Sequence, residues 1–270
     1  MPVSVVHGHK VWQRRDRATA LKHWLGWIVG VCLFMVCWRI IAGATNWFFV
    51  WDAPRQGSEF FGRLFPPEWS YVVELGRPFW DTLNMATLGT LISVVIALPI
   101  AVLTARNTTP HPLLRALGLL IIVVSRSVNS LIWALLLVAI LGPGVLAGVL
   151  AIALRSIGFV GKLFYEAIEE VNPAPIEAIT ATGASPTQIL SYAILPQVLP
   201  SLVGVSVFRW DINLRESTVI GLVGAGGLGL QLDAAVNALQ WPRASLIFLV
   251  ILLLVLLSEA TSARVRRSIT

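Results

Sequence analysis

Residues 244–263 read ASLIFLVILLLVLLSEATSA, a run in which Glu259 is the single charged residue. A helix needs about 20 consecutive apolar residues to cross the hydrocarbon core of a bilayer, and this run has that length. A surface helix of a soluble protein would show polar positions on one face. The run therefore predicts a membrane-spanning helix.

Five further apolar runs precede it along the chain. They cover about residues 24–44, 81–105, 113–141, 145–164 and 199–223. The run at 113–141 has a polar middle at residues 125–130, and each half has about a dozen residues, too short to cross a bilayer alone. We interpret it as one tilted or kinked helix. The sequence predicts an all-α, polytopic membrane protein with about six transmembrane helices.

The composition agrees with this class. Of the 270 residues, 56% are hydrophobic and 13% are charged, against about 25% charged in a typical soluble domain. A soluble chain of this length could not bury so much apolar surface in one core, which excludes a soluble enzyme, a disordered chain and a disulfide scaffold. Cys32 and Cys37 lie in one apolar run, so neither a disulfide framework nor a metal site is indicated.

Basic residues predict the orientation of the spans. The net charge is +6, and because the basic residues lie at the ends of apolar runs, they favour a role in membrane orientation over nucleic-acid binding. Six spans place both termini on one side. With the termini inside, the cytoplasmic basic residues are Lys10, Arg14, Arg15, Arg17, Lys22, Arg106, Arg115, Lys162, Arg264, Arg266 and Arg267, and the outer ones are Arg55, Arg63, Arg77 and Arg243. This asymmetry predicts cytoplasmic termini.

Two connections between the spans are long. Residues 46–80 face outward in this topology and are rich in Trp and Phe, which is typical of a segment lying along the membrane interface. Residues 165–198 are cytoplasmic. They predict a short helix, a turn at Gly183, and a second short helix in which Ser185 is the N-cap and Pro186 the first residue. Such an elbow is suited to docking in a groove of a partner protein.

This loop resembles the coupling loop of ABC importer permeases. The family pattern is Glu-Ala-Ala, then Gly four residues later, then Ile-x-Leu-Pro about ten residues on. Ile179 and Ala193 depart from it. The residues that the resemblance assigns to ATPase coupling are Glu177, Ala178, Gly183, Ala184, Leu195 and Pro196.

The resemblance narrows to the phosphonate-type importer permeases and covers about residues 79–267, with residues 214–229 the most family-like block. It implies the ABC type I importer permease fold in a prokaryotic inner membrane. It also implies a homodimer, two ATPase subunits that hold ATP and Mg, a soluble binding protein, and phosphonate, phosphate or phosphite as cargo. Residues 1–80 would then hold a cytoplasmic segment, the first transmembrane helix and an interfacial segment, and residues 81–267 the permease core.

Alternatives remain at this point. The cargo could be methionine or another small solute, and a secondary anion transporter is a rival that would lack the coupling loop. The chain holds no Gly-x-x-x-x-Gly-Lys-Ser/Thr loop, so we expect ATP hydrolysis on a separate subunit, no catalytic residue and no cofactor or metal here. An intramembrane enzyme is disfavoured because His7, His9, His23 and His111 lie outside the predicted spans.

A glycine-rich stretch follows the fifth span. It satisfies Gly-x-Gly-x-x-Gly, but a membrane helix precedes it where a dinucleotide site requires a strand. The stretch has two readings, static close packing and an outer gate. The candidate glycines are Gly221, Gly224, Gly226, Gly227 and Gly229.

Charged residues within the spans need partners or a water-filled cavity, because a charge at the bilayer centre costs roughly 2.5–3.5 kcal/mol on insertion scales. Asp211 and Arg215 are four residues apart and can form a structural ion pair on one helix face. Arg126 and Arg155 have no acidic residue within about one turn of the same helix. The candidate anion path comprises Arg126, Asn129, Arg155 and Arg215, with a structural role as the alternative.

Overall fold

The computed structural model describes residues 3–6, 9–12 and 17–269. His7, Arg14 and Arg15, which entered the sequence predictions, lie outside the described residues. The chain divides into two compact units, Met1–Phe61 and Gly62–Thr270. The division of function at residue 80 stays a prediction, since the segment 62–80 belongs to the second unit by packing.

The first unit holds a short hairpin and a long apolar helix. Strands β1 (Val3–Val6) and β2 (His9–Trp12) pair antiparallel, and α1 (Arg17–Ala44) follows. Helix α2 (Trp47–Leu64) is amphipathic, and Asp52, Arg55 and Glu59 pair on its polar face. Its place at the membrane interface stays a prediction.

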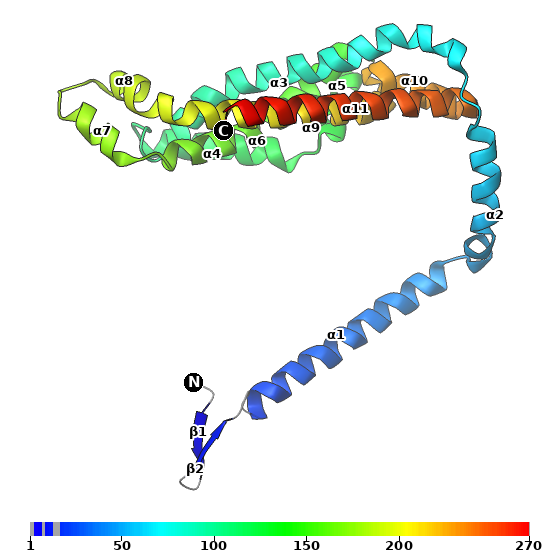
Figure 1. The fold of residues 1–270 in the computed structure, drawn as a ribbon, viewed down its shortest axis with the longest axis horizontal. Helices are drawn as coiled ribbons and strands as arrows, with labels where there is room; N and C mark the ends of the chain where they lie inside the picture. Colours follow the sequence, from blue (N-terminus) through cyan, green and yellow to red (C-terminus); the bar gives the residue numbers. More distant parts are fainter. Residues whose placement is uncertain (1–2, 7–8, 13–16, 270) are drawn as a thin grey trace. The chain divides into compact units, whose positions relative to one another are not determined.

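The second unit is a helical bundle whose long helices run side by side (Figure 1). Its elements are η1 (Trp69–Leu75), α3 (Gly76–Thr104), α4 (Pro112–Ser127), α5 (Ser130–Leu141), α6 (Val145–Glu169), α7 (Pro173–Thr180), α8 (Pro186–Ile189), η2 (Leu190–Ile194), α9 (Leu195–Ile220), η3 (Gly221–Ala225), α10 (Gly227–Asn237) and α11 (Trp241–Ile269). Helices α7 and α8 lie at one end and α10 at the other (Figure 1).

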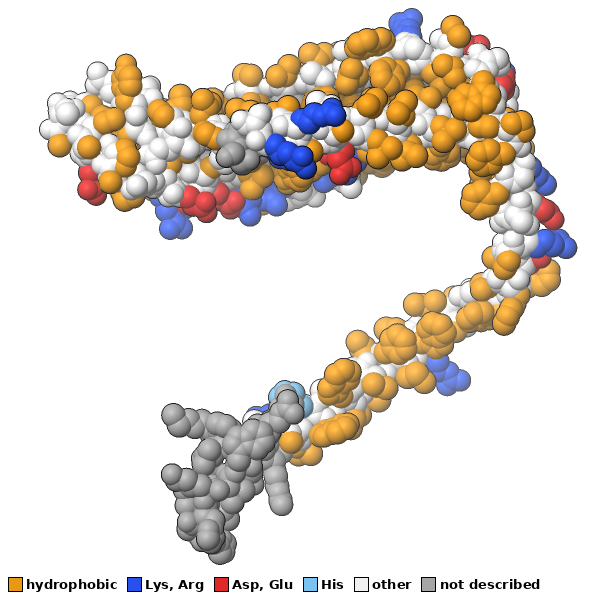
Figure 2. All heavy atoms as spheres, in the orientation of Figure 1, with side chains coloured by type: hydrophobic (Ala, Val, Ile, Leu, Met, Phe, Trp, Pro, Cys, Tyr) orange, Lys and Arg blue, Asp and Glu red, His pale blue; other side chains and the backbone are white. Residues whose placement is uncertain are grey.

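Among the described residues, the structure has five or six apolar spans, in line with the prediction of about six. Within the described part of the chain, five helical segments are long and apolar enough to cross a membrane, and α4 with α5 makes six if this bent pair forms one span. Hydrophobic side chains are spread along the visible flank of the bundle (Figure 2). Such a surface is suited to lipid, since the backbone polar groups are satisfied within the helices.

The prediction of one tilted or kinked helix over residues 113–141 is wrong. The chain bends by 87° between α4 and α5. Val128 is extended, and the side chain of Asn129 accepts a hydrogen bond from the N–H of Leu131 at 3.1 Å. Asn129 therefore caps a new helix, and the polar middle of the run marks a break.

Helix α6 lies at the centre of the bundle and packs against α3, α4, α5 and α9. Small residues permit the close approach. A Cβ on Gly89 of α3 would lie 2.6 Å from Ile152 Cγ2 on α6, and a Cβ on Gly148 would lie 2.5 Å from Met85 Sδ. Close packing of small residues is the usual way in which membrane helices associate, because lipid supplies no hydrophobic drive between them.

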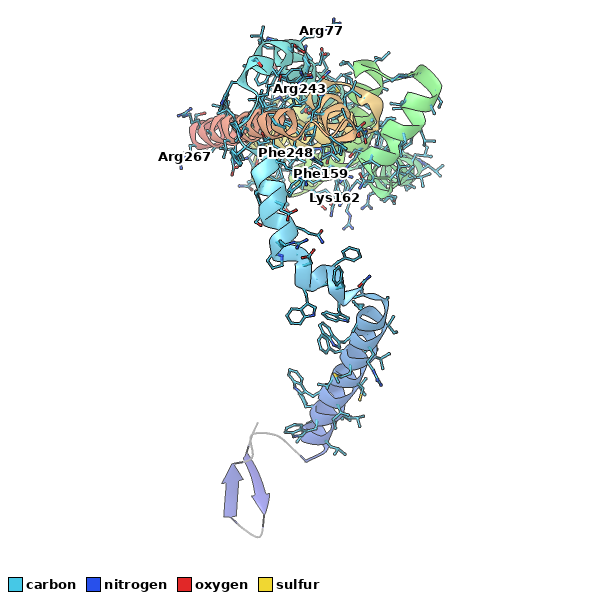
Figure 3. The ribbon with its side chains drawn as sticks, turned by 90° about the vertical axis from the view of Figure 1, so that its right-hand side faces the viewer. Arg77, Phe159, Lys162, Arg243, Phe248 and Arg267 are labelled. Carbon is cyan, nitrogen blue, oxygen red and sulfur yellow. The ribbon has the colours of Figure 1, made fainter. Side chains whose placement is uncertain are left out.

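At the α10 end, a polar cluster joins η1, α10 and α11. Arg243 donates from Nε to Glu68 Oε2 at 2.8 Å and from a terminal nitrogen to Glu68 Oε1 at 3.2 Å. This hydrogen bonding lowers the pKa of Glu68. The guanidinium lies 4.9 Å from the centroid of the Tyr71 ring, and the Tyr71 hydroxyl donates to Gln231. Figure 3 views the bundle from this end, with Arg243 labelled.

Candidate functional site

The predicted coupling loop is an exposed elbow at the end of the bundle opposite α10 (Figure 1). Helix α7 begins after Asn172, whose side chain accepts from the N–H of Ala174 at 3.0 Å, and Pro173 is its first residue. A turn follows in which Gly183 has φ +78°. The N–H of Ser185 donates to Gln188 Oε1 at 2.8 Å at the start of α8.

The second helix of the elbow differs from the prediction. It is the first part of one helical run, Pro186–Ala225, that continues through the π turn η2 into α9. Glu177, Ala178 and Gly183 are exposed on the elbow, and Leu195 and Pro196 are exposed at the start of α9.

The elbow is fixed to the bundle at its base. The N–H of Asn172 donates to Gln197 Oε1 at 3.0 Å, and Gln197 Nε2 donates to the carbonyl of Ala193 at 2.7 Å. Ile176 and Ile189 pack against the apolar core formed by α3, α6 and α9. A surface that touches the tip of the elbow therefore acts on a rigid base.

The candidate glycines form a compact break at the other end of α9. Gly224, Gly226 and Gly227 have positive φ values of 91°, 93° and 70°. A Cβ on Gly229 would lie 2.8 Å from the Cα of Gly221, so the two glycines allow α10 to fold back onto α9. Gly226, Gly227 and Gly229 are buried.

Two contacts hold this break in place. The N–H of Gly144 donates to the carbonyl of Gly224 at 3.0 Å. The N–H of Leu228 donates to Thr82 Oγ1 at 2.9 Å, so a hydroxyl from α3 caps the first turn of α10. These contacts fit static packing, and the choice between packing and a gate stays open.

Asp211 and Arg215 lie together on α9. A terminal nitrogen of Arg215 is 2.6 Å from Asp211 Oδ2, and the hydroxyl of Ser258 on α11 donates to Asp211 Oδ1 at 2.6 Å. Asp211 is buried, whereas the side chain of Arg215 is 48% exposed and lies 3.8 Å from the exposed Glu259. The pair therefore connects α9 to α11.

The interior of the bundle holds a second set of charged residues, whose contacts the sequence did not predict. Glu216 on α9 accepts from Arg209, one of whose terminal nitrogens lies 3.4 Å from both carboxylate oxygens. Arg155 on α6 lies on the other side, with its Nε 3.4 Å from Glu216 Oε1. We call Arg155, Arg209 and Glu216 the central charge cluster. Arg155 thus has a cross-helix acid.

Hydrogen bonds extend from this cluster through the core. Arg209 Nε donates to Ser156 Oγ at 3.0 Å, and Ser156 Oγ donates to Asn213 Oδ1 at 3.1 Å. Asn213 Nδ2 donates to Thr90 Oγ1 at 2.8 Å. The Arg209 guanidinium also lies 5.1 Å from the centroid of the Phe159 ring, labelled in Figure 3. The chain of bonds joins α3, α6 and α9.

Sequence reasoning missed Ser156, Asn213 and Thr90. Each is a polar residue inside an apolar run, and that was the available signal. Their pairing is not visible in the sequence, because 57 residues separate Ser156 from Asn213 and 123 separate Asn213 from Thr90.

Arg126 and Asn129 lie on the surface at the break between α4 and α5. A Cβ on Gly158 would meet Arg126 Cγ at 2.7 Å, so the stem of Arg126 packs one helical turn from Arg155 on α6. The neighbouring Ser125 hydroxyl accepts from the N–H of Gly158 at 2.8 Å and donates to the carbonyl of Leu154. No ion pair of Arg126 is found among the residues that the structure describes.

Replacement of Asp211 tests the structural ion pair. We expect Asp211→Asn to lower the yield of folded protein, because it weakens a buried link to Ser258 and leaves Arg215 with a single distant acid, a loss of about 1–3 kcal/mol. Glu259→Gln is the matched control, since it removes the other, exposed acid near Arg215 and should change little. Thermal unfolding of the purified protein measures both. Equal effects of the two variants would contradict the assignment.

Comparisons with known proteins show which family has this arrangement of helices. The family model described as binding-protein-dependent transport system inner membrane component matches residues 97–269. The phosphite transport system permease protein PtxC of Stutzerimonas stutzeri is 42% identical over 241 residues, covering 89% of this chain and 86% of that protein. The phosphate-import permease protein PhnE of Mycolicibacterium smegmatis is 44% identical over 205 residues, covering 76% of this chain and 38% of that protein.

A solved structure of the MetNI methionine ABC transporter, in inward-facing conformations, matches with a TM-score of 0.66 and 25% identity, over 75% of this chain and 99% of that chain. The predicted type I importer permease fold is thereby confirmed. Members of the family work in importers with ATPase and binding-protein partners. The chain belongs to the binding-protein-dependent transport system inner membrane components and is a membrane-spanning, non-catalytic permease subunit of an ABC importer.

Proposed function

We propose that the chain carries a phosphorus oxyanion, such as phosphite, phosphate or a phosphonate, across the inner membrane. The observation that carries the proposal is the central charge cluster, where two arginines share one carboxylate inside the bundle. Because unbalanced charge is costly in a membrane interior, an excess of positive charge at this depth favours an anionic cargo. The relatives named for phosphite and phosphate import support the same class.

The path that we propose runs past Arg155 on α6 and past Arg126 on α4, whose stem packs against α6 at Gly158, with Asn129 and the half-exposed Arg215 as further polar groups. Spread along a path, such groups attract an oxyanion without holding it tightly. Tight selection then belongs to the binding protein, and this chain needs only a weak site.

In the assembly that we propose, each end of the bundle contacts a different partner. Two copies of the chain form a homodimer within the lipid. The α7–α8 elbow of each copy docks on an ATPase subunit, which holds ATP and Mg, and the binding protein docks at the α10 end. Coupling rests on Glu177, Ala178, Gly183, Ala184, Leu195 and Pro196. Closure of the ATPase pair moves the elbows and opens the bundle outward for cargo.

Uptake measurements test the cargo. The permease with its ATPase and binding protein, reconstituted in proteoliposomes, should take up radiolabelled phosphite, phosphate or phosphonate in an ATP-dependent manner. Arg126→Gln should lower this uptake several-fold while the complex assembles normally. Arg63→Gln, which removes an exposed arginine from α2, is the control. Uptake of methionine in preference to every phosphorus oxyanion would replace this proposal with the methionine alternative, which the MetNI likeness favours.

Replacement of Gly183 tests the role of the elbow in coupling. A Cβ at this position meets nothing within 4 Å, so crowding within this chain does not limit the side chain here. The constraint is the positive φ of 78°, which a bulky residue adopts only under strain. We expect Gly183→Phe to uncouple ATP hydrolysis from transport.

Gly183→Asn is the matched control for that variant, because Asn tolerates positive φ. It should keep most of the coupling. Membrane insertion should be normal for both variants, since the loop lies outside the spans. Transport by Gly183→Phe at the native ratio of cargo to ATP would remove the coupling assignment.

Cysteine labelling tests the orientation. In a background with Cys32 and Cys37 replaced by Ser, cysteines placed near Arg14 and near Arg267 should react with an impermeant maleimide only from the cytoplasmic side. A cysteine at Gln56 should react only from outside. Labelling of the two termini from opposite sides would contradict the six-span topology.

A further inference from the structure

The central charge cluster carries one unbalanced positive charge. Arg155 and Arg209 both contact Glu216, at 3.4 Å in each case. In the described part of the chain, no other acid lies within ion-pair distance of either arginine. Two guanidinium groups and one carboxylate sum to a formal charge of +1.

The two arginines are not equivalent. The side chain of Arg209 is 2% exposed, bonds to Ser156 and lies against the Phe159 ring. The side chain of Arg155 is 31% exposed and meets Glu216 through Nε. For the terminal nitrogens of Arg155, no hydrogen-bond partner is found among the described residues. The terminal N–H groups of Arg155 therefore stay available to a ligand, whereas Arg209 is buried and uses a terminal nitrogen on Glu216.

Glu216 is held at this point by Arg209. Removing the carboxylate would leave a buried guanidinium without a counter-charge, which is strongly unfavourable. Arg155 has no such constraint, since it is partly exposed. An anion that reaches the cluster can therefore take the terminal nitrogens of Arg155, while Glu216 stays with Arg209.

We propose that Glu216 is a positioning residue that sets how fast the cargo leaves: it stays beside Arg155, repels the oxyanion that Arg155 attracts, and keeps that binding weak. This inference rests on the proposed function and names the regulation of the same path. Transport requires binding that is strong enough for entry and weak enough for exit. With Glu216 ionised the cluster charge is +1; without it the charge would be +2, and an oxyanion would be retained.

The first measurement is equilibrium binding of radiolabelled inorganic phosphate and phosphite to the purified permease–ATPase complex without the binding protein. We expect little retention by the native complex and at least about tenfold tighter binding by Glu216→Gln. The gain should vanish in the double variant Glu216→Gln/Arg155→Gln, because the attracting group is then absent. Glu59→Gln removes a carboxylate from α2 by the same substitution and should show no gain.

The second measurement is uptake in proteoliposomes with the binding protein present. Glu216→Gln should lower the maximal rate several-fold and lower the cargo concentration for half-maximal rate, whereas a purely structural role would lower the rate alone. Glu216→Asp keeps the charge and should restore much of the native rate. Tighter binding that survives Arg155→Gln, or assembled Glu216→Gln complex with native binding and rate, would overturn the proposal.

Arg155→Gln alone covers the case in which Glu216→Gln fails to assemble. It leaves the Arg209–Glu216 pair intact and neutral, so the bundle should fold. Reduced uptake by the assembled complex, with a raised half-maximal concentration, supports the proposal, and native uptake overturns it. Failure of the proposed function has a different signature, since the native complex would then take up no phosphorus oxyanion at all.

Discussion

A guanidinium in the middle of an apolar bundle has to find all its partners within the protein, because lipid offers neither water nor hydrogen bonds. Arg209 meets this constraint with Glu216, Ser156 and the face of the Phe159 ring. Ser156 in turn depends on Asn213, which donates to Thr90. One buried charge therefore specifies the relative register of α3, α6 and α9, since a shift of any of them by one turn would leave a buried polar group unpaired.

Small residues make this polar chain possible. The helices can share hydrogen bonds only where their backbones approach closely, and Gly89 and Gly158 supply such places. At Gly158 the hydroxyl of Ser125 reaches the backbone of α6 and contacts both Gly158 and Leu154. In a soluble protein a large apolar core would contribute more of the stability. Here close packing and internal polar bonds share that role.

The sequence predicted the parts of the fold that depend on local pattern. Run length located the spans, and Gly183 with Ser185 and Pro186 located the elbow. The break between α4 and α5 was missed because hydropathy measures apolarity and not backbone direction, although Asn129 is a good helix cap. The Arg155–Glu216 contact was missed for another reason: the two residues are 61 positions apart, and periodicity within one helix cannot show which helices are neighbours.

The order of features along one helix joins the coupling elbow to the path. The helical run Pro186–Ala225 contains the start of the elbow's second helix, then Arg209 and Glu216, and then the glycine break, where Val223 and Gly224 leave helical geometry. Its central part, α9, has 26 residues and is about 39 Å long at 1.5 Å per residue. A π turn lies at the elbow end of α9, and such turns are common at functional sites. Because α9 is internally hydrogen-bonded, a displacement at its elbow end is carried along it instead of being absorbed, and Glu216 moves with it. Arg155 belongs to α6, so a shift between α6 and α9 changes the distance between Arg155, which attracts the anion, and Glu216, which repels it. We infer that movement of the elbow alters how strongly the path holds its anion.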